Sequence, residues 1–356
     1  MSRRLARRIA RLLASVLPFA GACAGARVSD VTYAAHGGWK AYDARLPSEL
    51  RLSPEARLQE STWTWQGYRV HLDELGASGA AKGTVVLLHG GGGNGRLLMA
   101  YAPMLSAAGW HVVAPDFPGF GLTQPEDGPL ASLSGWGSIA AALATARRQA
   151  TGQPVVLVGM SVGSTVAYDA AARGAPVDGI AITMFGDPAD ADVRRALAGS
   201  WWRAHVLLPL SRWTAFATDG MRWRVRDMAP LTRMTPDSAL VRVFRDDPLI
   251  GRRRVRGSLL RSMVATPLAV PPESFTRVPV LLLVPDADAW TPAHHSEATF
   301  RRLAAPKRMV VLPGAGHFPI EPMALAVLRE SLLEFFDTPT GGPTPPPSLP
   351  SPRALP

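Results

Sequence analysis

The chain contains little cysteine and comparatively few charged residues. Cys23 is the only cysteine among 356 residues, so no disulfide can form within the chain. Charged residues make up 19% of the sequence and apolar residues 47%, a composition that excludes an intrinsically disordered chain and allows a substantial core. The apolar run over residues 12–20 is too short to span a bilayer as a mature helix. We therefore expect one large domain, or one domain with an insertion.

Acidic residues are absent from the N-terminal end. No Asp or Glu precedes Asp30, whereas five of the 38 Lys and Arg residues lie in the first eleven positions. Part of the net charge of +10 is therefore local to this end. The rest of the chain shows no basic stripe interleaved with aromatic residues, so we expect no nucleic-acid partner.

Residues 1–26 have the pattern of an export signal. An arginine-rich stretch leads into the apolar run 12–20, and small residues follow it, with sequences suited to a signal peptidase at 20–22 and 24–26. The first arginine pair also matches part of a twin-arginine signal. We expect an exported protein that is periplasmic, anchored in the envelope or secreted. The alternative is a basic amphipathic helix on a cytoplasmic protein.

Cys23 follows small residues, as the lipid-carrying cysteine of a bacterial lipoprotein does. Ala20 stands where that signal usually has leucine. Lipidation of Cys23, with membrane association through the N-terminus, is therefore an alternative to simple cleavage.

Apolar strands alternate with helices along most of the chain. Runs rich in Val, Ile and Leu predict strands at 84–88, 111–115, 155–159, 180–184, 278–284 and 308–312. Helical patterns are expected at 96–108, 138–150, 164–172 and 322–336. This alternation is typical of an α/β fold with a mostly parallel sheet covered on both faces. A hairpin at 62–72, turning at Gln66-Gly67, adds an antiparallel edge.

The same pattern divides the chain into regions. We expect the core at 61–186 and 276–337, preceded by an extension at 27–60 with no clear element. Residues 187–275 contain no convincing strand and are interpreted as an inserted helical cap over the strand ends. The Pro-rich tail, 338–356, is expected to be disordered.

A serine between two glycines follows the strand at 155–159. The sequence Gly159-Met160-Ser161-Val162-Gly163 leads directly into a helical segment. In a strand-turn-helix context this pattern holds the serine hydroxyl in a cleft at the end of the sheet. We therefore predict that Ser161 is a nucleophile.

A glycine-rich loop, His89-Gly90-Gly91-Gly92-Gly93-Asn94, follows the strand at 84–88. Bare glycines bring backbone N–H groups close to a substrate, and acyl transfer needs such donors for the negative oxygen of its tetrahedral intermediate. We assign the two donors of this oxyanion hole to the backbone amides of Gly91 and Val162.

Two late loops supply the other groups that a nucleophilic serine needs. Asp286 and Asp288 follow the strand at 278–284, and either could orient a histidine on chemical grounds. His317 lies in a glycine-flanked loop after the last strand and is placed to act as general base. The remaining histidines have no Cys or acid cluster at metal-ligand spacing, so we predict neither metal nor cofactor.

The chain order Ser161, Asp288, His317 on strand ends resembles the α/β-hydrolase family. The resemblance covers residues 60–336 and includes the segment 116–123, Asp-Phe-Pro-Gly-Phe-Gly-Leu-Thr. It implies that Asp288, four residues before Pro292, is the acid of the triad rather than Asp286. The sequence departs from the family pattern at Pro285, where glycine is usual.

The segment Phe244–Ile250 of the cap is similar to monoacylglycerol-lipase-like and lysophospholipase-like members. This resemblance implies a serine hydrolase that cleaves carboxylic esters of small molecules or lipids through an acyl-enzyme. Peptide cleavage next to proline, acyl transfer to an alcohol, and a non-catalytic binding protein on the same fold are the alternatives. The sequence indicates no oligomeric state.

The proposed cap is rich in Trp and Arg. Its tryptophans are Trp201, Trp202, Trp213 and Trp223, and its arginines include Arg252, Arg253, Arg254, Arg256 and Arg261. These residues could rest on an anionic lipid surface. We favour the simpler interpretation, in which the Trp residues pack the cap onto the core and the Arg residues form a solvated face.

Overall fold

A computed structural model describes residues 32–52, 56–188, 190–198, 210 and 213–337. The chain divides into two compact units, Met1–Thr32 and Tyr33–Pro356, and the fold lies in the second. The expected export signal, Cys23 and the Pro-rich tail lie outside the described residues and stay predictions. None of the helices within the described ranges is long and apolar enough to cross a membrane.

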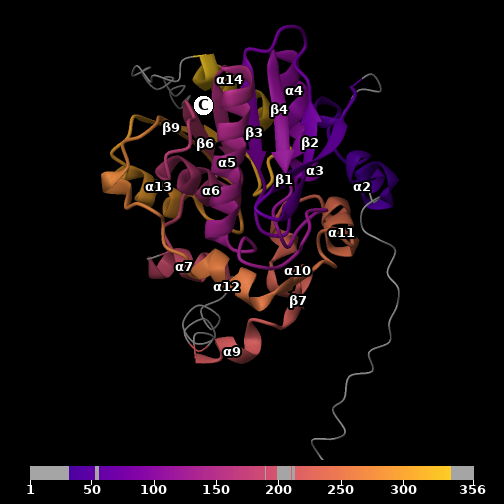
Figure 1. Ribbon diagram of the computed structural model, residues 1–356, viewed down its shortest axis with the longest axis vertical. Coiled ribbons are helices and arrows are strands. Elements are labelled where there is room, and N and C mark those ends of the chain that lie inside the picture. Colours follow the sequence, from indigo (N-terminus) through magenta and orange to yellow (C-terminus); the bar gives the residue numbers. More distant parts are fainter. Residues whose placement is uncertain (1–31, 53–55, 189, 199–209, 211–212, 338–356) are drawn as a thin grey trace, which may run out of the picture. The chain divides into compact units, whose positions relative to one another are not determined.

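A twisted sheet of eight strands forms the centre of this unit (Figure 1). Its order is β1-β2-β4-β3-β5-β6-β9-β10, and β2 is antiparallel to both of its neighbours while the other pairs are parallel. The strands are β1 (Gln59–Trp65), β2 (Tyr68–Leu75), β3 (Gly83–Leu88), β4 (Trp110–Pro115), β5 (Val155–Gly159), β6 (Gly179–Ile182), β9 (Val280–Pro285) and β10 (Lys307–Leu312). The predicted α/β class and all six predicted parallel strands are confirmed.

Helices cover both faces of the sheet because alternate strand residues point to opposite sides. Val86 and Leu88 pack into one apolar core, with residues of α5 and α6, whereas Val85 and Leu87 pack into another, with residues of α4 and α14. The core helices are α3 (Gly95–Leu98), α4 (Ala102–Ala107), α5 (Leu133–Thr151), α6 (Val162–Ala172), α13 (Ala293–Arg302) and α14 (Pro322–Asp337), with the 3-10 turn η4 (Met99–Tyr101).

The predicted hairpin forms, and the extension before it is structured. Gln66 and Gly67 have φ of 45° and 79°, the positive values that a two-residue hairpin turn needs. The segment 33–50, in which we expected no element, contains η2 (Tyr33–Ala35), α2 (Gly37–Asp43) and η3 (Ser48–Leu50). Its Tyr42 and Leu46 are buried in the core beside α4, so burial of a few apolar side chains fixes a segment without periodicity.

The inserted region is mainly helical but also contains a two-stranded ribbon. Its helical elements are α7 (Ala191–Ala198), α9 (Ala215–Thr218), α10 (Val225–Met228), η6 (Leu231–Arg233), α11 (Ser238–Asp246), α12 (Gly257–Ala265) and η7 (Pro272–Ser274). The ribbon pairs β7 (Arg222–Arg224) with β8 (Arg254–Arg256), antiparallel. The expectation of no strand was therefore wrong, because two three-residue strands are too short to show a period of two.

Ion pairs join the cap to the core. Arg253 and Arg222 bind Glu126, and Arg222 and Arg256 both reach Asp127, at N–O distances of 2.9–3.3 Å. Arg253 and Arg256 of the basic cap are therefore held by carboxylates of the core, whereas Arg252 and Arg254 are exposed.

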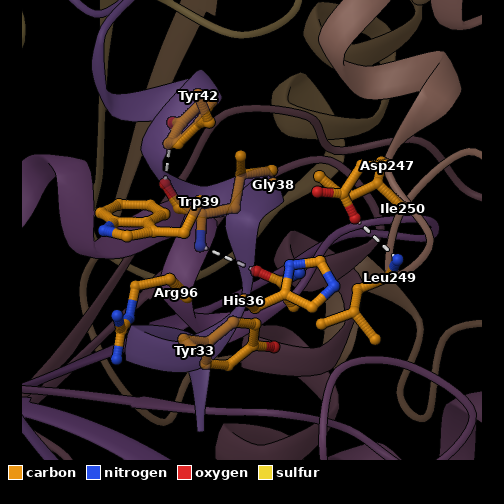
Figure 2. Close-up of a pocket in the computed structure, with 11 residues that line it drawn as sticks. Tyr33, His36, Gly38, Trp39, Tyr42, Arg96, Asp247, Leu249 and Ile250 are labelled. Carbon is orange, nitrogen blue, oxygen red and sulfur yellow. Dashed lines mark hydrogen bonds between the residues drawn. The ribbon is translucent and has the colours of Figure 1, made fainter.

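Tyr33 and Trp39 of the N-terminal segment pack on Arg96, which belongs to a buried cluster of charges. Arg96 binds Asp73 through two N–O contacts of 2.6 and 3.0 Å and Glu60 through one of 2.8 Å, and it lies against the rings of Tyr33 and Trp39. Figure 2 shows Arg96 below a small cavity between α2 and the cap loop at Asp247.

His71 completes this cluster. Its Nε2 lies 3.1 Å from Glu60, and its Nδ1 lies 3.2 Å from the buried Asp116. Glu60, His71 and Asp73 come close enough together to offer a metal three ligands, a grouping that sequence spacing could not reveal. Because Arg96 already binds both of the carboxylates, we interpret the cluster as an ion-pair network.

The network predicts a pH-dependent loss of stability in His71→Gln. Burial lowers the pKa of His71, but its contacts with Asp116 and Glu60 outweigh that effect and raise the pKa from 6.5 to about 10. The stabilisation is therefore complete below pH 6.5 and is lost as the pH rises through about 10. We expect the variant to lose about 3–5 kcal/mol of unfolding free energy at pH 7, because buried carboxylates lose their partner.

Guanidinium denaturation of the two proteins at pH 7 and above pH 10 measures this loss. The more exposed pair of His111 with Glu74 supplies the control, and His111→Gln should cost less than about 1 kcal/mol, since Glu74 keeps Arg147 as a partner. An equal loss for His71→Gln at both pH values would contradict the ion-pair interpretation.

Candidate active site

Ser161 stands at a sharp turn between β5 and α6. Its φ of 54° and ψ of −127° are strained for a residue with a side chain, and they lift the hydroxyl out of the line of the strand. Glycine is required on either side of it. A Cβ at Gly159 would lie 2.3 Å from the carbonyl oxygen of Gly163, and one at Gly163 would lie 2.0 Å from that of Leu88. The sequence pattern therefore forms the turn that it predicted.

The three predicted side chains form one hydrogen-bonded series. His317 Nε2 lies 2.9 Å from Ser161 Oγ, and His317 Nδ1 lies 2.7 Å from Asp288 Oδ2. They come from the ends of three different strands, β5, β9 and β10. His317 and Asp288 are almost fully buried, so their contact is shielded from water.

Only one of the two candidate acids lies beside His317. Asp288 also accepts hydrogen bonds from the backbone of Trp290 and Thr291 and from the hydroxyl of Thr291. Burial raises the pKa of Asp288, but His317 and the Thr291 hydrogen bonds outweigh burial, so its pKa is lowered. Asp286 is instead exposed and accepts a bond from the Gly314 amide, the role of a turn residue.

Sequence analysis missed two residues beside His317. The Trp290 ring lies 4.7 Å from the imidazole, centroid to centroid, and Thr291 Oγ1 lies 3.3 Å from Nδ1. Trp290 and Thr291 come two and three positions after Asp288. Their closeness in sequence to the predicted acid was the one feature that could have indicated a place in the site. On its other side, the His317 loop is tied to the cap by the Phe318 amide, which donates to Met234.

The glycine loop after β3 lies against the serine. A Cβ at Gly90 would come 2.9 Å from Ser161 Cβ, so only glycine allows this approach. The hydrogen bonds found among the described residues include none donated by the amides of Gly91 or Val162. Both predicted donors are therefore free to bind an oxygen, and Val162 is the first residue of α6, where a helix carries partial positive charge.

Buried polar groups hold this loop in place. Asp116 accepts from the Gly95 amide at 2.6 Å, and Asn94 caps α3 by accepting from the Leu97 amide. His89 receives the Phe117 amide on Nε2, and burial lowers the pKa of His89 and keeps this nitrogen an acceptor. The segment that begins at Asp116, which resembles the family's motif, therefore holds both ends of the glycine loop in position.

Apolar side chains of the cap cover the glycine loop. A Cβ at Gly91 would lie 3.1 Å from Met263 of α12, and one at Gly92 would lie 2.8 Å from Val225 of α10. Both side chains belong to the same apolar core as Leu259 and, at its edge, Val162. A group bound at the serine would therefore meet an apolar cap.

Comparison with known proteins agrees with this architecture. The model of the serine aminopeptidase, S33, hydrolase family matches residues 79–321, more than half of the chain. The protein therefore belongs to this family of α/β-hydrolases and is a serine hydrolase. No curated protein matches the chain significantly.

Several solved structures share the fold. The monoacylglycerol lipase of Paleococcus ferrophilus is 22% identical with a TM-score of 0.60, over 75% of this chain and 98% of that one. A soluble variant of monoglyceride lipase from Saccharomyces cerevisiae is 16% identical with a TM-score of 0.65, over 82% and 98%. A thermostable carboxyl esterase from Bacillus coagulans is 16% identical with a TM-score of 0.59, over 79% and 98%. At these identities the likeness shows the α/β-hydrolase fold.

Proposed function

We propose that the protein hydrolyses carboxylic esters with an apolar acyl chain, through an acyl-enzyme on Ser161. The observation that carries the proposal is the continuous series from Ser161 through His317 to Asp288, placed under an apolar cap. A serine in hydrogen-bond contact with a histidine that a buried carboxylate orients has the arrangement of an activated nucleophile.

Each residue of the site then has a defined role in the reaction. Ser161 Oγ attacks the ester carbonyl and passes its proton to His317 Nε2. The amides of Gly91 and Val162 hold the oxyanion that forms. His317 returns the proton to the departing alcohol, leaving an acyl-serine. It then takes a proton from the attacking water and passes it to Ser161 Oγ as the acid leaves. Asp288 keeps Nδ1 protonated and stabilises the imidazolium in both steps.

The cap favours an ester over a peptide with a free amino group. The family's description names an aminopeptidase, whose substrate carries an ammonium group near the scissile bond. The cap side chains nearest to Gly91 and Gly92 are Met263 and Val225, and neither carries a charge. An unpaired ammonium in apolar surroundings costs several kcal/mol, so such a substrate would bind poorly here.

A substrate panel tests this choice. We expect p-nitrophenyl esters and monoacylglycerols with acyl chains of several carbons to exceed aminoacyl p-nitroanilides, proline included, by at least about a hundredfold in kcat/KM. An alcohol acceptor in the same assay separates hydrolysis from acyl transfer. Faster turnover of the aminoacyl anilides would replace the ester proposal with peptidase activity on the same triad.

A further inference from the structure

The cap exposes an apolar tip. Five of the eight exposed large apolar side chains in the described part of the chain lie within fourteen positions, and we call them the cap tip: Leu210, Trp213, Phe216, Met221 and Trp223. Trp213 and Phe216 are 83% and 91% exposed, so they do not pack the cap onto the core, as our simpler interpretation expected. In Figure 1, α9 and β7 lie at the end of the cap away from the sheet. Clustered exposed aromatic side chains mark an interaction surface.

The ribbon beside the tip places two arginine pairs directly across from each other. Arg222 faces Arg256, and both reach Asp127, which lies between them at 3.3 and 2.9 Å. Arg224 faces Arg254, and both are exposed, with no ion pair among the residues that the structure describes. Like charges directly opposite each other destabilise a ribbon. The second pair therefore lacks the anion that the first pair has.

We propose that the cap tip docks on an anionic lipid surface, where lipid phosphates fill the place between Arg224 and Arg254. Charge complementarity selects this occupant, because a neutral apolar partner would leave the two arginines facing each other uncompensated. Trp213 and Phe216, the most exposed side chains of the tip, match the boundary between headgroups and acyl chains, which Trp and Phe favour.

The cap tip contacts α12, the cap helix that covers the glycine loop of the active site. The Gly257 amide, at the start of α12, donates to the carbonyl oxygen of Met221 in the tip. The same helix carries Met263 over the glycine loop. Docking would therefore place the ester site next to its source of lipid, although the docking itself does not depend on the catalytic roles proposed above.

Vesicle flotation of the full chain tests the proposal, with Ser161→Ala added so that lipid stays intact. The vesicles contain phosphatidylcholine with or without phosphatidylglycerol. Each cation at an anionic bilayer is worth about fivefold in binding, so Arg224→Gln/Arg254→Gln should weaken binding to the anionic vesicles about 25-fold. Trp213→Ser/Phe216→Ser should weaken it about a hundredfold.

Matched variants on other surfaces serve as controls. Arg45→Gln/Arg57→Gln removes the same charge from exposed positions, and Met323→Ser removes a side chain that is 69% exposed. Neither should change vesicle binding. Tip variants that bind as tightly as these controls would overturn the proposal, as would tip variants that change only the oligomeric state.

Insertion of the tip is measured separately from any binding by the basic N-terminus. A fluorophore on Phe216→Cys, with Cys23→Ser, should be quenched by brominated lipid, whereas one on Met323→Cys should not. Absence of quenching at position 216 would overturn the proposal. With Ser161 present, the tip variants should hydrolyse a short water-soluble ester at the original rate, so failed docking and a failed triad give different results.

Discussion

Replacing Ser161 with alanine is expected to lower kcat/KM on the best ester substrate by at least about 10³-fold. The variant loses the only atom that can form the acyl-enzyme, whereas the Gly91 and Val162 amides still bind the oxyanion. Alanine also keeps a Cβ at the strained φ of 54°, so the turn itself does not change. Steady-state kinetics on the preferred ester of the panel measure the loss.

Covalent labelling completes this test. A fluorophosphonate should add one adduct to the original protein, located at Ser161 by peptide mass spectrometry, and none to Ser161→Ala. Thermal unfolding is the control for folding, because Ser161 Oγ has His317 as its hydrogen-bond partner and no role in the core. A variant that keeps near-full esterase activity, or an adduct on another serine, would remove Ser161 from the mechanism.

Replacing Asp288 with asparagine is expected to cost about 10⁴-fold in kcat. The amide has nearly the same shape, but its NH₂ group cannot accept a hydrogen bond from His317 Nδ1–H as the carboxylate does. The imidazole then presents the wrong tautomer to Ser161, and the imidazolium that forms during attack loses its counter-charge. The rate of hydrolysis under substrate saturation measures this effect.

Asp286→Asn is the matched control for this variant. The two aspartates lie two positions apart in one loop, but Asp286 is exposed and accepts a hydrogen bond from the Gly314 amide, away from His317. We expect its replacement to leave kcat within about threefold, since the loss is that of one surface hydrogen bond of about 1 kcal/mol or less. A larger loss in Asp286→Asn than in Asp288→Asn would transfer the acid role.

The central strands of the sheet could be predicted from sequence because they are buried on both faces. Every residue of the strand 155–159 is buried, and a continuous run of Val and Leu is typical of a strand that is buried on both faces. The hairpin was equally readable, since Gln66-Gly67 carries the turn conformation in its glycine. Ser161 and His317 became candidates because they lie in loops after strands of one sheet, whereas the choice of Asp288 over Asp286 came from the resemblance to the family.

The parts that could not be predicted depend on contacts between distant segments. The ribbon of β7 and β8 joins residues 30 to 34 positions apart, and its Arg-rich strands of three residues are too short to show a period of two. The charged cluster brings together Glu60, His71 and Arg96 from different elements. No local sequence pattern indicates that these side chains meet. Trp290 could not be recognised as a site residue, because the conformation of the loop that carries Asp288 determines its position beside His317.

The close contact between Gly163 and the Leu88 carbonyl limits how this enzyme can evolve. The turn that carries the nucleophile packs directly against the end of the strand that leads into the glycine loop, and no side chain fits between them. A substitution that changed the shape of the nucleophile turn would therefore also disturb the glycine loop, and the reverse holds as well. New substrates are therefore most easily acquired through the cap, whose contact side chains Met263 and Val225 can change size while the reacting groups stay fixed.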